Sequence, residues 1–135
     1  MDPQLSTLSN DTKSGIAARI LIADDDTSSR ELLRAILESS GYEVVEAADG
    51  VEAMERAADF PPDLVILDIQ MPKMDGLAAA QALRKIPSFE KTPIIALTAS
   101  TKGVLSEDIS MAGFTSYLVK PIGPAQLRQH ISDLL

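Results

Sequence analysis

The sequence predicts an α/β domain built on a five-stranded parallel sheet with helices on both faces. Five short apolar runs recur along the chain, and they are unbroken rather than alternating, which is typical of strands buried on both faces. Stretches with a helical spacing of apolar residues separate these runs. The chain has 135 residues and no internal repeat, which suits one domain with one core. This alternation favours right-handed crossovers between parallel strands.

The apolar runs are the expected strands. They span residues 20–23, 44–45, 64–67, 94–97 and 117–119. Glu43 and Glu46 flank the second run, and such charged flanks indicate an edge strand. The flavodoxin-like strand order 2-1-3-4-5, with the strands numbered along the chain, places this strand at an edge. We therefore expect that order.

Helices are expected after the first two strands. The first begins at a capping-box pattern, Ser28 and Glu31, and ends at Gly41, where a helix should stop. The second begins at Asp49 as its N-cap and runs to about Asp59, because two prolines follow. Their inward-facing residues are Leu32, Leu33, Ile36 and Leu37 in the first and Ala53, Met54, Ala57 and Ala58 in the second.

Three more helices are expected in the second half of the chain. The third carries the apolar stripe Leu77, Ala80 and Leu83, and Asp75 suits its N-cap. The fourth, over residues 102–112, contains Gly and polar residues that lower its helix propensity, so we expect it to be the mobile element. Pro124 suits the first turn of the fifth.

Composition excludes several classes of protein. Acidic residues outnumber basic ones by 20 to 12, and the net charge of −8 repels nucleic-acid backbones and anionic membranes. The absence of cysteine excludes disulfides and thiolate metal sites. There is no signal-peptide pattern and no apolar run of the roughly 20 residues that cross a bilayer. We expect a cytoplasmic protein that binds neither nucleic acid nor membrane, with residues 1–17 as a flexible leader and one domain over 18–135.

Acidic residues follow two strands that the expected order makes neighbours. Asp24, Asp25 and Asp26 follow the first strand, and Asp68 ends the third. Ligands of open α/β sheets bind at the carboxyl ends of strands, where the strand order reverses. Packed carboxylates repel unless a cation lies among them, and an all-oxygen ligand set favours Mg²⁺ over zinc. The sequence therefore predicts a Mg²⁺ site, although Asp26 could instead cap a helix and a lone Asp68 could start a turn.

Two other strand ends bring polar groups to the same rim. Thr98 follows the fourth strand and Lys120 the fifth. Alone, the threonine would most often cap a helix and the lysine would be solvated. Together with Asp68 and a divalent cation they are the groups that phosphoryl transfer requires, because cation and ammonium neutralise the phosphoryl oxygens while a carboxylate attacks in line. Asp68 would then become an aspartyl phosphate.

Four stretches closely resemble the receiver domains of two-component response regulators, in sequence and in spacing. They are ILIADDD, LVILDIQMPKMDG, PIIALTAS and YLVKPI, and the resemblance covers about residues 18 to 135. It implies that Asp68 is the phosphoacceptor, that Asp24 and Asp25 form the acidic pocket, and that Thr98 and Lys120 contact the phosphoryl oxygens. It also implies that Asp25, Asp68 and the backbone carbonyl of Gln70 hold Mg²⁺.

The resemblance further implies a switch and a set of partners. Thr98 and Tyr117 would be the switch pair, and the Lys120-Pro121 bond would be cis. The face made by the fourth helix, fifth strand and fifth helix would carry the signal to a downstream protein. The phosphoryl donor would be a histidine kinase or a histidine phosphotransfer protein. The chain would act as a monomer or a weak phosphorylation-linked dimer, with no enzymatic activity beyond its own phosphorylation and dephosphorylation.

Two other functions have to be weighed. A Mg²⁺-dependent phosphohydrolase with Asp68 as nucleophile is one, but such haloacid-dehalogenase-like enzymes place a second acid where this chain has Gln70. Flavin binding is the other, but three aspartates stand where a flavodoxin has its phosphate-binding loop. Between a stand-alone receiver and a piece of a hybrid kinase, the polar leader favours the stand-alone form, although Ile122 also resembles hybrid-kinase receivers. His130 is expected on a helix surface rather than as a phosphodonor.

Overall fold

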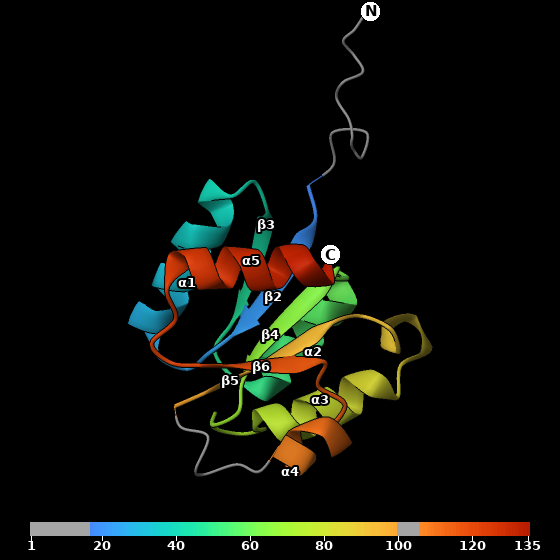
Figure 1. The fold of residues 1–135 in the computed structure, drawn as a ribbon. Helices are drawn as coiled ribbons and strands as arrows, with labels where there is room; N and C mark the ends of the chain where they lie inside the picture. The colour runs from blue at the N-terminus through green and yellow to red at the C-terminus, as the bar shows by residue number, and fades with distance from the viewer. Residues whose placement is uncertain (1–16, 100–105) are drawn as a thin grey trace, which may run out of the picture.

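The computed structural model describes residues 17–99 and 106–135. In this part of the chain one parallel sheet of five strands has the order β3-β2-β4-β5-β6, labelled as in Figure 1. The strands are β2 (Arg19–Ala23), β3 (Glu43–Ala47), β4 (Leu64–Asp68), β5 (Ile94–Thr98) and β6 (Ser116–Val119). Numbered along the described chain, this is the predicted order 2-1-3-4-5. The charge-flanked strand β3 lies at an edge, as its flanking glutamates predict.

Helices cover both faces of the sheet (Figure 1). They are α1 (Thr27–Ser39), α2 (Gly50–Asp59), α3 (Gly76–Arg84), α4 (Ser106–Met111) and α5 (Pro124–Leu134), with a short 3₁₀ helix η1 (Pro87–Phe89) before β5. One apolar cluster joins α1 and α5 to one face of the sheet, and a second joins α2, α3 and α4 to the other. The predicted inward residues Leu33, Ile36 and Leu37 of α1 are buried. Leu32 is 57% exposed instead, because it lies at the outer edge of the stripe.

The predicted capping box at Ser28 and Glu31 is wrong. The N-cap of α1 is Asp26, which has an extended backbone and accepts a hydrogen bond from the Ser29 N–H at 3.2 Å. An aspartate caps as well as a serine does, so the helix begins earlier and Glu31 lies beyond the first turn. Gly41 ends the helix as predicted, with the left-handed φ of 93° that glycine adopts without strain.

The other helix ends follow the predictions where the structure describes them. Asp49 caps α2 through the Glu52 N–H, and Asp75 caps α3 through the Ala78 N–H. Pro124 is in the first turn of α5. The expected fourth helix is described only over Ser106–Met111, and residues 102–105 of that prediction lie outside the described residues, as does most of the expected leader. Within the described ranges, no helix is long and apolar enough to span a membrane.

Arg84, at the end of α3, joins three segments of the α4 side of the molecule. Its Nε donates to the Gly113 carbonyl at 2.8 Å, and its Nη1 donates to the Phe89 and Thr92 carbonyls, both at 2.7 Å. Its Nη2 lies 3.4 Å from the Thr115 hydroxyl. One guanidinium therefore satisfies backbone acceptors of the η1 turn and of the connection from α4 to β6.

Arg84→Met is expected to destabilise the protein by about 2–3 kcal/mol, because several partly buried carbonyls lose a charged donor at once. Urea unfolding followed by circular dichroism measures this loss. Arg56→Met is the matched control, because the Arg56 side chain is 43% exposed and, among the described residues, pairs only with Glu52 of its own helix. That variant should stay within about 0.5 kcal/mol of the wild type. Equal losses in the two variants would show that Arg84 is no more than a surface residue.

Candidate functional site

Three aspartates meet at the carboxyl ends of β2 and β4. The two strands are parallel neighbours with Ala23 opposite Leu67, so the next residues, Asp24 and Asp68, lie side by side. One carboxylate oxygen of each of Asp24, Asp25 and Asp68 lies within 4.8 Å of the others. Asp24 is fully buried, Asp68 is 8% exposed and Asp25 is exposed. The predicted convergence of these side chains is confirmed.

Lys120 reaches this cluster from the end of β6. Its Nζ donates to Asp24 Oδ2 at 2.9 Å and to Asp68 Oδ2 at 2.8 Å. The Lys120 N–H donates to the Thr98 carbonyl at 2.8 Å, which continues the pairing of β5 and β6 beyond the strand. The Lys120-Pro121 peptide is cis, as the resemblance implied. One ammonium is therefore shared by two carboxylates that are 44 residues apart in the sequence.

The pKa values of the two buried aspartates, Asp24 and Asp68, are shifted in opposite directions. Burial would raise the pKa of Asp24, but hydrogen bonds from the Asp26 N–H and the Lys120 ammonium outweigh burial and hold this pKa below its ordinary value. Burial raises the pKa of Asp68, because the bonds from Lys120 and the Gln70 N–H offset it only in part and the Asp24 charge adds to it. Burial would lower the pKa of Lys120, but its bonds to the two carboxylates raise it.

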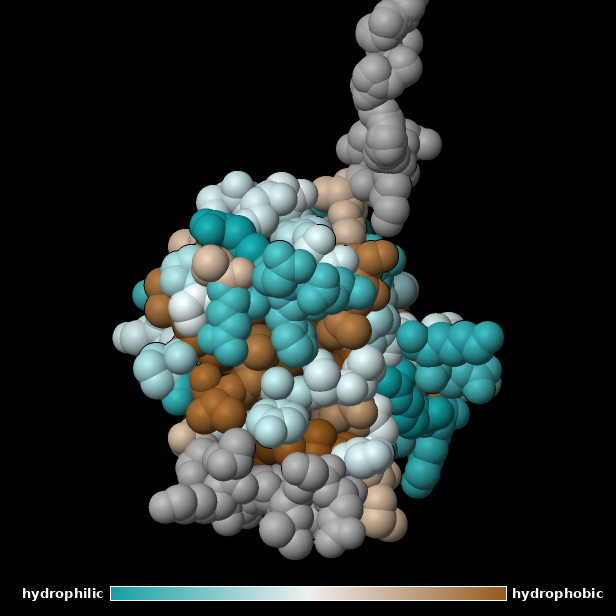
Figure 2. All heavy atoms as spheres, viewed as in Figure 1, coloured by the Kyte–Doolittle hydropathy of each residue, from teal (hydrophilic) through white to brown (hydrophobic). Residues whose placement is uncertain are grey.

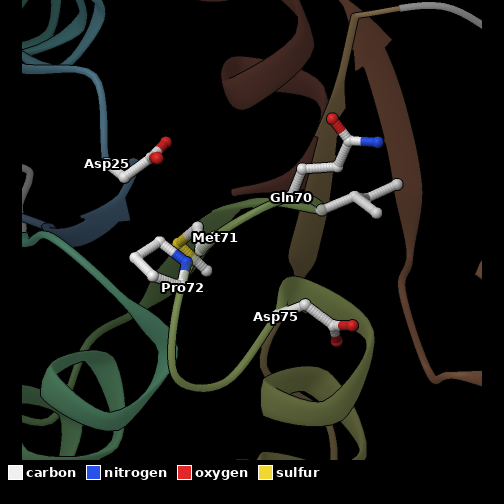
Figure 3. A pocket seen from close by; sticks show the side chains of 6 residues that line it. Asp25, Gln70, Met71, Pro72 and Asp75 are labelled. Carbon is white, nitrogen blue, oxygen red and sulfur yellow. The ribbon is translucent and has the colours of Figure 1, made fainter.

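The side of the cluster at Asp25 is open. A cleft of about 610 Å³ is lined by Asp25, Ile69, Gln70, Met71, Pro72 and Asp75. Figure 3 shows Asp25 facing across this cleft toward the segment of Gln70, Met71 and Pro72, with Asp75 beyond it at the start of α3. Within residues 17–99 and 106–135, the Asp25 carboxylate has no hydrogen bond or ion pair. The site therefore has three carboxylates and one ammonium, and one of these carboxylates, that of Asp25, is unpartnered at an open cleft. This donor set suits a hard divalent cation such as Mg²⁺.

The loop after β4 is held by two close approaches of glycine. A Cβ on Gly76 would lie 2.3 Å from the Asp68 carbonyl oxygen, and a Cβ on Gly50 would lie 2.1 Å from the Met74 carbonyl oxygen. The Gly50 N–H donates to that same Met74 oxygen at 3.0 Å. Asp75 caps α3 as the sequence predicts, whereas the sequence did not indicate that the start of α2 holds this loop.

The two residues of the expected switch lie on neighbouring strands. Thr98 ends β5 and is 5% exposed, whereas Tyr117 on β6 is 39% exposed. Tyr117 pairs with Ala96, and both Ala96 and Thr98 lie on the α4 side of the sheet because residues alternate along a strand. A cavity of about 290 Å³ between α4 and β6 is lined in part by Ile109, Phe114 and Tyr117. The tyrosine ring therefore has space beside it.

Two polar residues make contacts that the sequence did not indicate. His130, expected on a helix surface, is half-buried on α5 with its Nε2 2.6 Å from the Ser116 hydroxyl of β6. Arg30 of α1 donates from Nη1 to the Asp24 carbonyl at 2.7 Å. The sequence does place a basic residue, Arg30, near the start of a helix and an acidic residue, Glu46, on the next strand, which could indicate an ion pair. It does not indicate that Arg30 also binds the Asp24 carbonyl.

A protein family model and sequence relatives match most of this chain. The family model described as the response regulator receiver domain matches residues 20–132. The signal transduction histidine-protein kinase BarA of Escherichia coli (strain K12) is 36% identical over 85% of this chain and 12% of its own length. The transcriptional regulatory protein PdtaR of Mycobacterium tuberculosis (strain ATCC 25618 / H37Rv) is 42% identical over 93% of this chain and 57% of its own length. The chain thus spans less than two thirds of both relatives.

Solved structures agree with the sequence relatives. The chemotaxis response regulator CheY4 of Vibrio cholerae superposes with a TM-score of 0.84 at 35% identity, over 89% of this chain and 100% of its own. The receiver domain of the sensor histidine kinase PA1611 from Pseudomonas aeruginosa, which has a magnesium ion coordinated in its active site cleft, gives a TM-score of 0.82 at 31% identity, over 88% of this chain and 98% of its own. These likenesses favour the receiver hypothesis over the phosphohydrolase alternative.

Proposed function

Because the chain belongs to the response regulator receiver domain family, we propose that it accepts a phosphoryl group on Asp68 from a phosphohistidine of a partner protein. The observation that carries this assignment is the position of Asp68 at the end of β4, beside two further aspartates and within 2.8 Å of the Lys120 ammonium. Asp68 bonds the ammonium, and the segment that follows it, Ile69 to Pro72, lines the open cleft. We also propose that the protein has no enzymatic activity on outside substrates.

The residues of the site support an in-line transfer. An oxygen of Asp68 attacks the phosphorus as the bond from phosphorus to the imidazole nitrogen breaks, and the electron pair of that bond returns to the histidine. The salt bridge to Lys120 favours the ionised, nucleophilic form of Asp68. Lys120 then stabilises the negative charge of the phosphoryl oxygens, and Thr98 at the neighbouring strand end is the proposed second donor. Burial of Asp24 beside Lys120 keeps the ammonium in place.

Receiver domains bind Mg²⁺ in their acidic site, and the donor set of this chain fits that ion. Asp24, Asp25 and Asp68 supply the carboxylates, and the Gln70 backbone carbonyl is the proposed additional ligand because Gln70 lines the same cleft as Asp25. Bound Mg²⁺ would offset the repulsion among the acids and neutralise charge on the phosphoryl oxygens. The net charge of the three aspartates and Lys120 is −2, which a divalent cation balances.

Intact-mass measurement tests the proposed function. Incubation with Mg²⁺ and acetyl phosphate is expected to add the mass of one phosphoryl group, in a linkage that survives acid and is lost in base because it is an acyl phosphate. Replacing Mg²⁺ by EDTA is expected to remove the adduct, because the attacking carboxylate and the phosphoryl oxygens would repel each other. An adduct that forms equally in EDTA would contradict the metal dependence, and no adduct with Mg²⁺ would contradict the function.

The proposed consequence of phosphorylation is a change at the face formed by α4, β6 and α5. A phosphoryl group at Asp68 would draw the Thr98 hydroxyl toward it, and the Tyr117 ring, now 39% exposed, could move into the space beside Ile109 and Phe114. One new hydrogen bond would then shift the equilibrium between two conformations of this surface, and a downstream protein would bind one of the two more tightly. A cytoplasmic location, a stand-alone form and a phosphorylation-linked dimer stay predictions.

An apolar groove beside the site fits the protein that donates the phosphoryl group. This α1 groove has a volume of about 470 Å³ and lies between α1 and the connection from β6 to α5. Its lining residues are Ser28, Ser29, Leu32, Leu33, Ala99, Lys120, Pro121 and Ile122. Figure 2 shows polar side chains over α5 and apolar side chains gathered between α5 and the lower edge of this face. Because Lys120 lines both the groove and the phosphoacceptor site, a protein seated in the groove would present its histidine to Asp68.

Leu32→Glu is expected to slow phosphotransfer from a histidine phosphotransfer protein by about tenfold or more, because an exposed apolar contact in the docking groove is replaced by a charge. Labelling by acetyl phosphate should be unchanged, since that donor needs no groove. Rapid-quench transfer from a phosphotransfer protein that labels the wild type measures the effect. Met111→Glu, on α4 with 81% exposure, is the control and should transfer normally. Equal slowing with both donors, or with both variants, would refute the docking assignment.

A further inference from the structure

We propose that Arg30 is a positioning residue that fixes the peptide between Asp24 and Asp25, and thereby directs the Asp25 carboxylate toward the metal site. The inference rests on the proposed function, because it assigns Asp25 as a metal ligand. It adds two residues from outside the acidic cluster: Arg30 of α1, and Glu46 of the edge strand β3, which binds the Arg30 guanidinium.

The contacts of Arg30 converge on the segment that carries the acids. Its Nη1 donates to the Asp24 carbonyl at 2.7 Å, and its backbone N–H donates to the Asp26 carbonyl at 3.0 Å. Its Nε donates to Glu46 Oε1 of β3 at 2.8 Å. The Arg30 side chain is only 17% exposed, so these bonds are shielded from water. The guanidinium thus ties the end of β2 to both the first helix and the edge strand.

The position of Asp25 depends on its backbone. Asp24 and Asp68 are fixed by Lys120, but the Asp25 carboxylate has no hydrogen bond or ion pair within the described residues. A peptide is planar, so holding the Asp24 carbonyl fixes the plane that ends at the Asp25 Cα, the atom from which the carboxylate side chain departs. The Asp24 N–H is held at the same time by the Ala47 carbonyl at 3.1 Å. Among the described residues, Arg30 is therefore the side chain that holds the peptide from which Asp25 extends.

An arginine suits this task better than a lysine. Its planar fork donates to two acceptors on different elements in a fixed geometry, whereas a lysine ammonium is a point charge on a flexible stem. Glu46 is itself held from a second side, because it also forms an ion pair with Arg34. Burial would raise the pKa of Glu46, but the bonds from Arg30 and Arg34 lower it, so this acceptor is charged at neutral pH.

Arg30→Lys tests the inference, with Mn²⁺ as the probe of the metal site. The free Mn²⁺ signal in electron paramagnetic resonance gives the dissociation constant without any phosphoryl transfer. Loss of a residue that orients a metal ligand is expected to weaken binding by about tenfold. Arg56→Lys is the matched control, since the Arg56 side chain pairs with Glu52 of α2 and, among the described residues, contacts neither Glu46 nor Asp24. Its Mn²⁺ affinity should stay within about twofold of the wild type, since it leaves the Asp24 peptide untouched.

The outcomes separate this inference from the proposed function. Unchanged Mn²⁺ affinity in Arg30→Lys, or an equal loss in Arg56→Lys, would overturn the positioning role even if acetyl phosphate still labels Asp68. Weakened Mn²⁺ binding in Arg30→Lys, combined with a wild type that takes no phosphoryl group, would sustain the positioning role and refute the function. If Arg30→Lys does not fold, Glu46→Gln replaces it. That variant loosens the same guanidinium and should weaken binding in the same direction, and full affinity there would again overturn the role.

Discussion

Asp68→Asn is expected to abolish the phosphoryl adduct that acetyl phosphate forms in the presence of Mg²⁺. The amide keeps the shape of the side chain but is neutral and is not a nucleophile. The variant should fold, because Asp24 keeps its salt bridge to Lys120. Asp24 is not placed to substitute, since it is fully buried against the Asp26 N–H and Lys120. Intact mass after incubation, followed by peptide mapping of the wild-type adduct, measures the result.

Asp75→Asn is the control for this variant. Asp75 lines the same cleft as Asp25, and its side chain caps α3 by accepting from the Ala78 N–H at 2.9 Å. Asparagine caps a helix equally well, so this variant should be labelled to the same extent as the wild type. An adduct on Asp68→Asn, or mapping of the wild-type adduct to any other aspartate, would refute Asp68 as the phosphoacceptor.

Lys120→Met is expected to lower the free energy of unfolding by about 2–4 kcal/mol at neutral pH in EDTA. Methionine replaces the apolar stem but leaves Asp24 and Asp68 without the ammonium between them. Breaking a buried ion pair from one side leaves uncompensated charge, which costs more than the pair contributes. We place the loss below the upper end for fully buried pairs because the Lys120 side chain is 26% exposed. Added Mg²⁺ should restore part of the loss, because it neutralises the same carboxylates.

The loss should depend on pH with a defined sign. In the wild type, the lowered pKa of Asp24 contributes stability above its unfolded value of about 3.9, and this contribution is lost as the pH falls through the folded value. The raised pKa of Lys120 contributes stability that is lost only above its unfolded value of about 10.4. Without the lysine, the pKa of Asp24 is expected to rise and the already raised pKa of Asp68 to rise further, so the folded variant binds more protons and becomes more stable as the pH falls. The difference from the wild type should be largest near pH 6–9 and shrink toward pH 4.

Urea unfolding at several pH values measures this dependence. Lys73→Met is the control, because the Lys73 side chain is 70% exposed and lies 3.6 Å from Asp49 at the surface. It should cost no more than about 0.5 kcal/mol, with little variation with pH. A Lys120→Met deficit that stays constant from pH 4 to 8 would mean that packing of the lysine stem, rather than its charge, stabilises the site.

The sequence by itself determined the architecture and the members of the acidic cluster. Unbroken apolar runs identify strands buried on both faces, and charged flanks identify the edge strand β3. Parallel strands end at one edge of a sheet, so residues that follow Ala23, Leu67, Leu97 and Val119 have to gather there. The convergence of Asp24, Asp25, Asp68 and Lys120 was predictable for this reason, although these residues are far apart in the chain.

Only the tertiary structure decided how these residues are held. Local sequence offers Ser28 and Asp26 as nearly equal caps for α1, and the folded chain uses Asp26. The bond from Arg30 to the Asp24 carbonyl and the bonds from Arg84 to loop carbonyls involve backbone acceptors, which every residue carries, so no residue pattern marks them. The opposite pKa shifts of Asp24 and Asp68 likewise depend on the different hydrogen-bond donors that the fold brings to two buried carboxylates around one shared ammonium. Burial and the choice of backbone partner are properties of the folded chain, because both are set by contacts between segments distant in sequence.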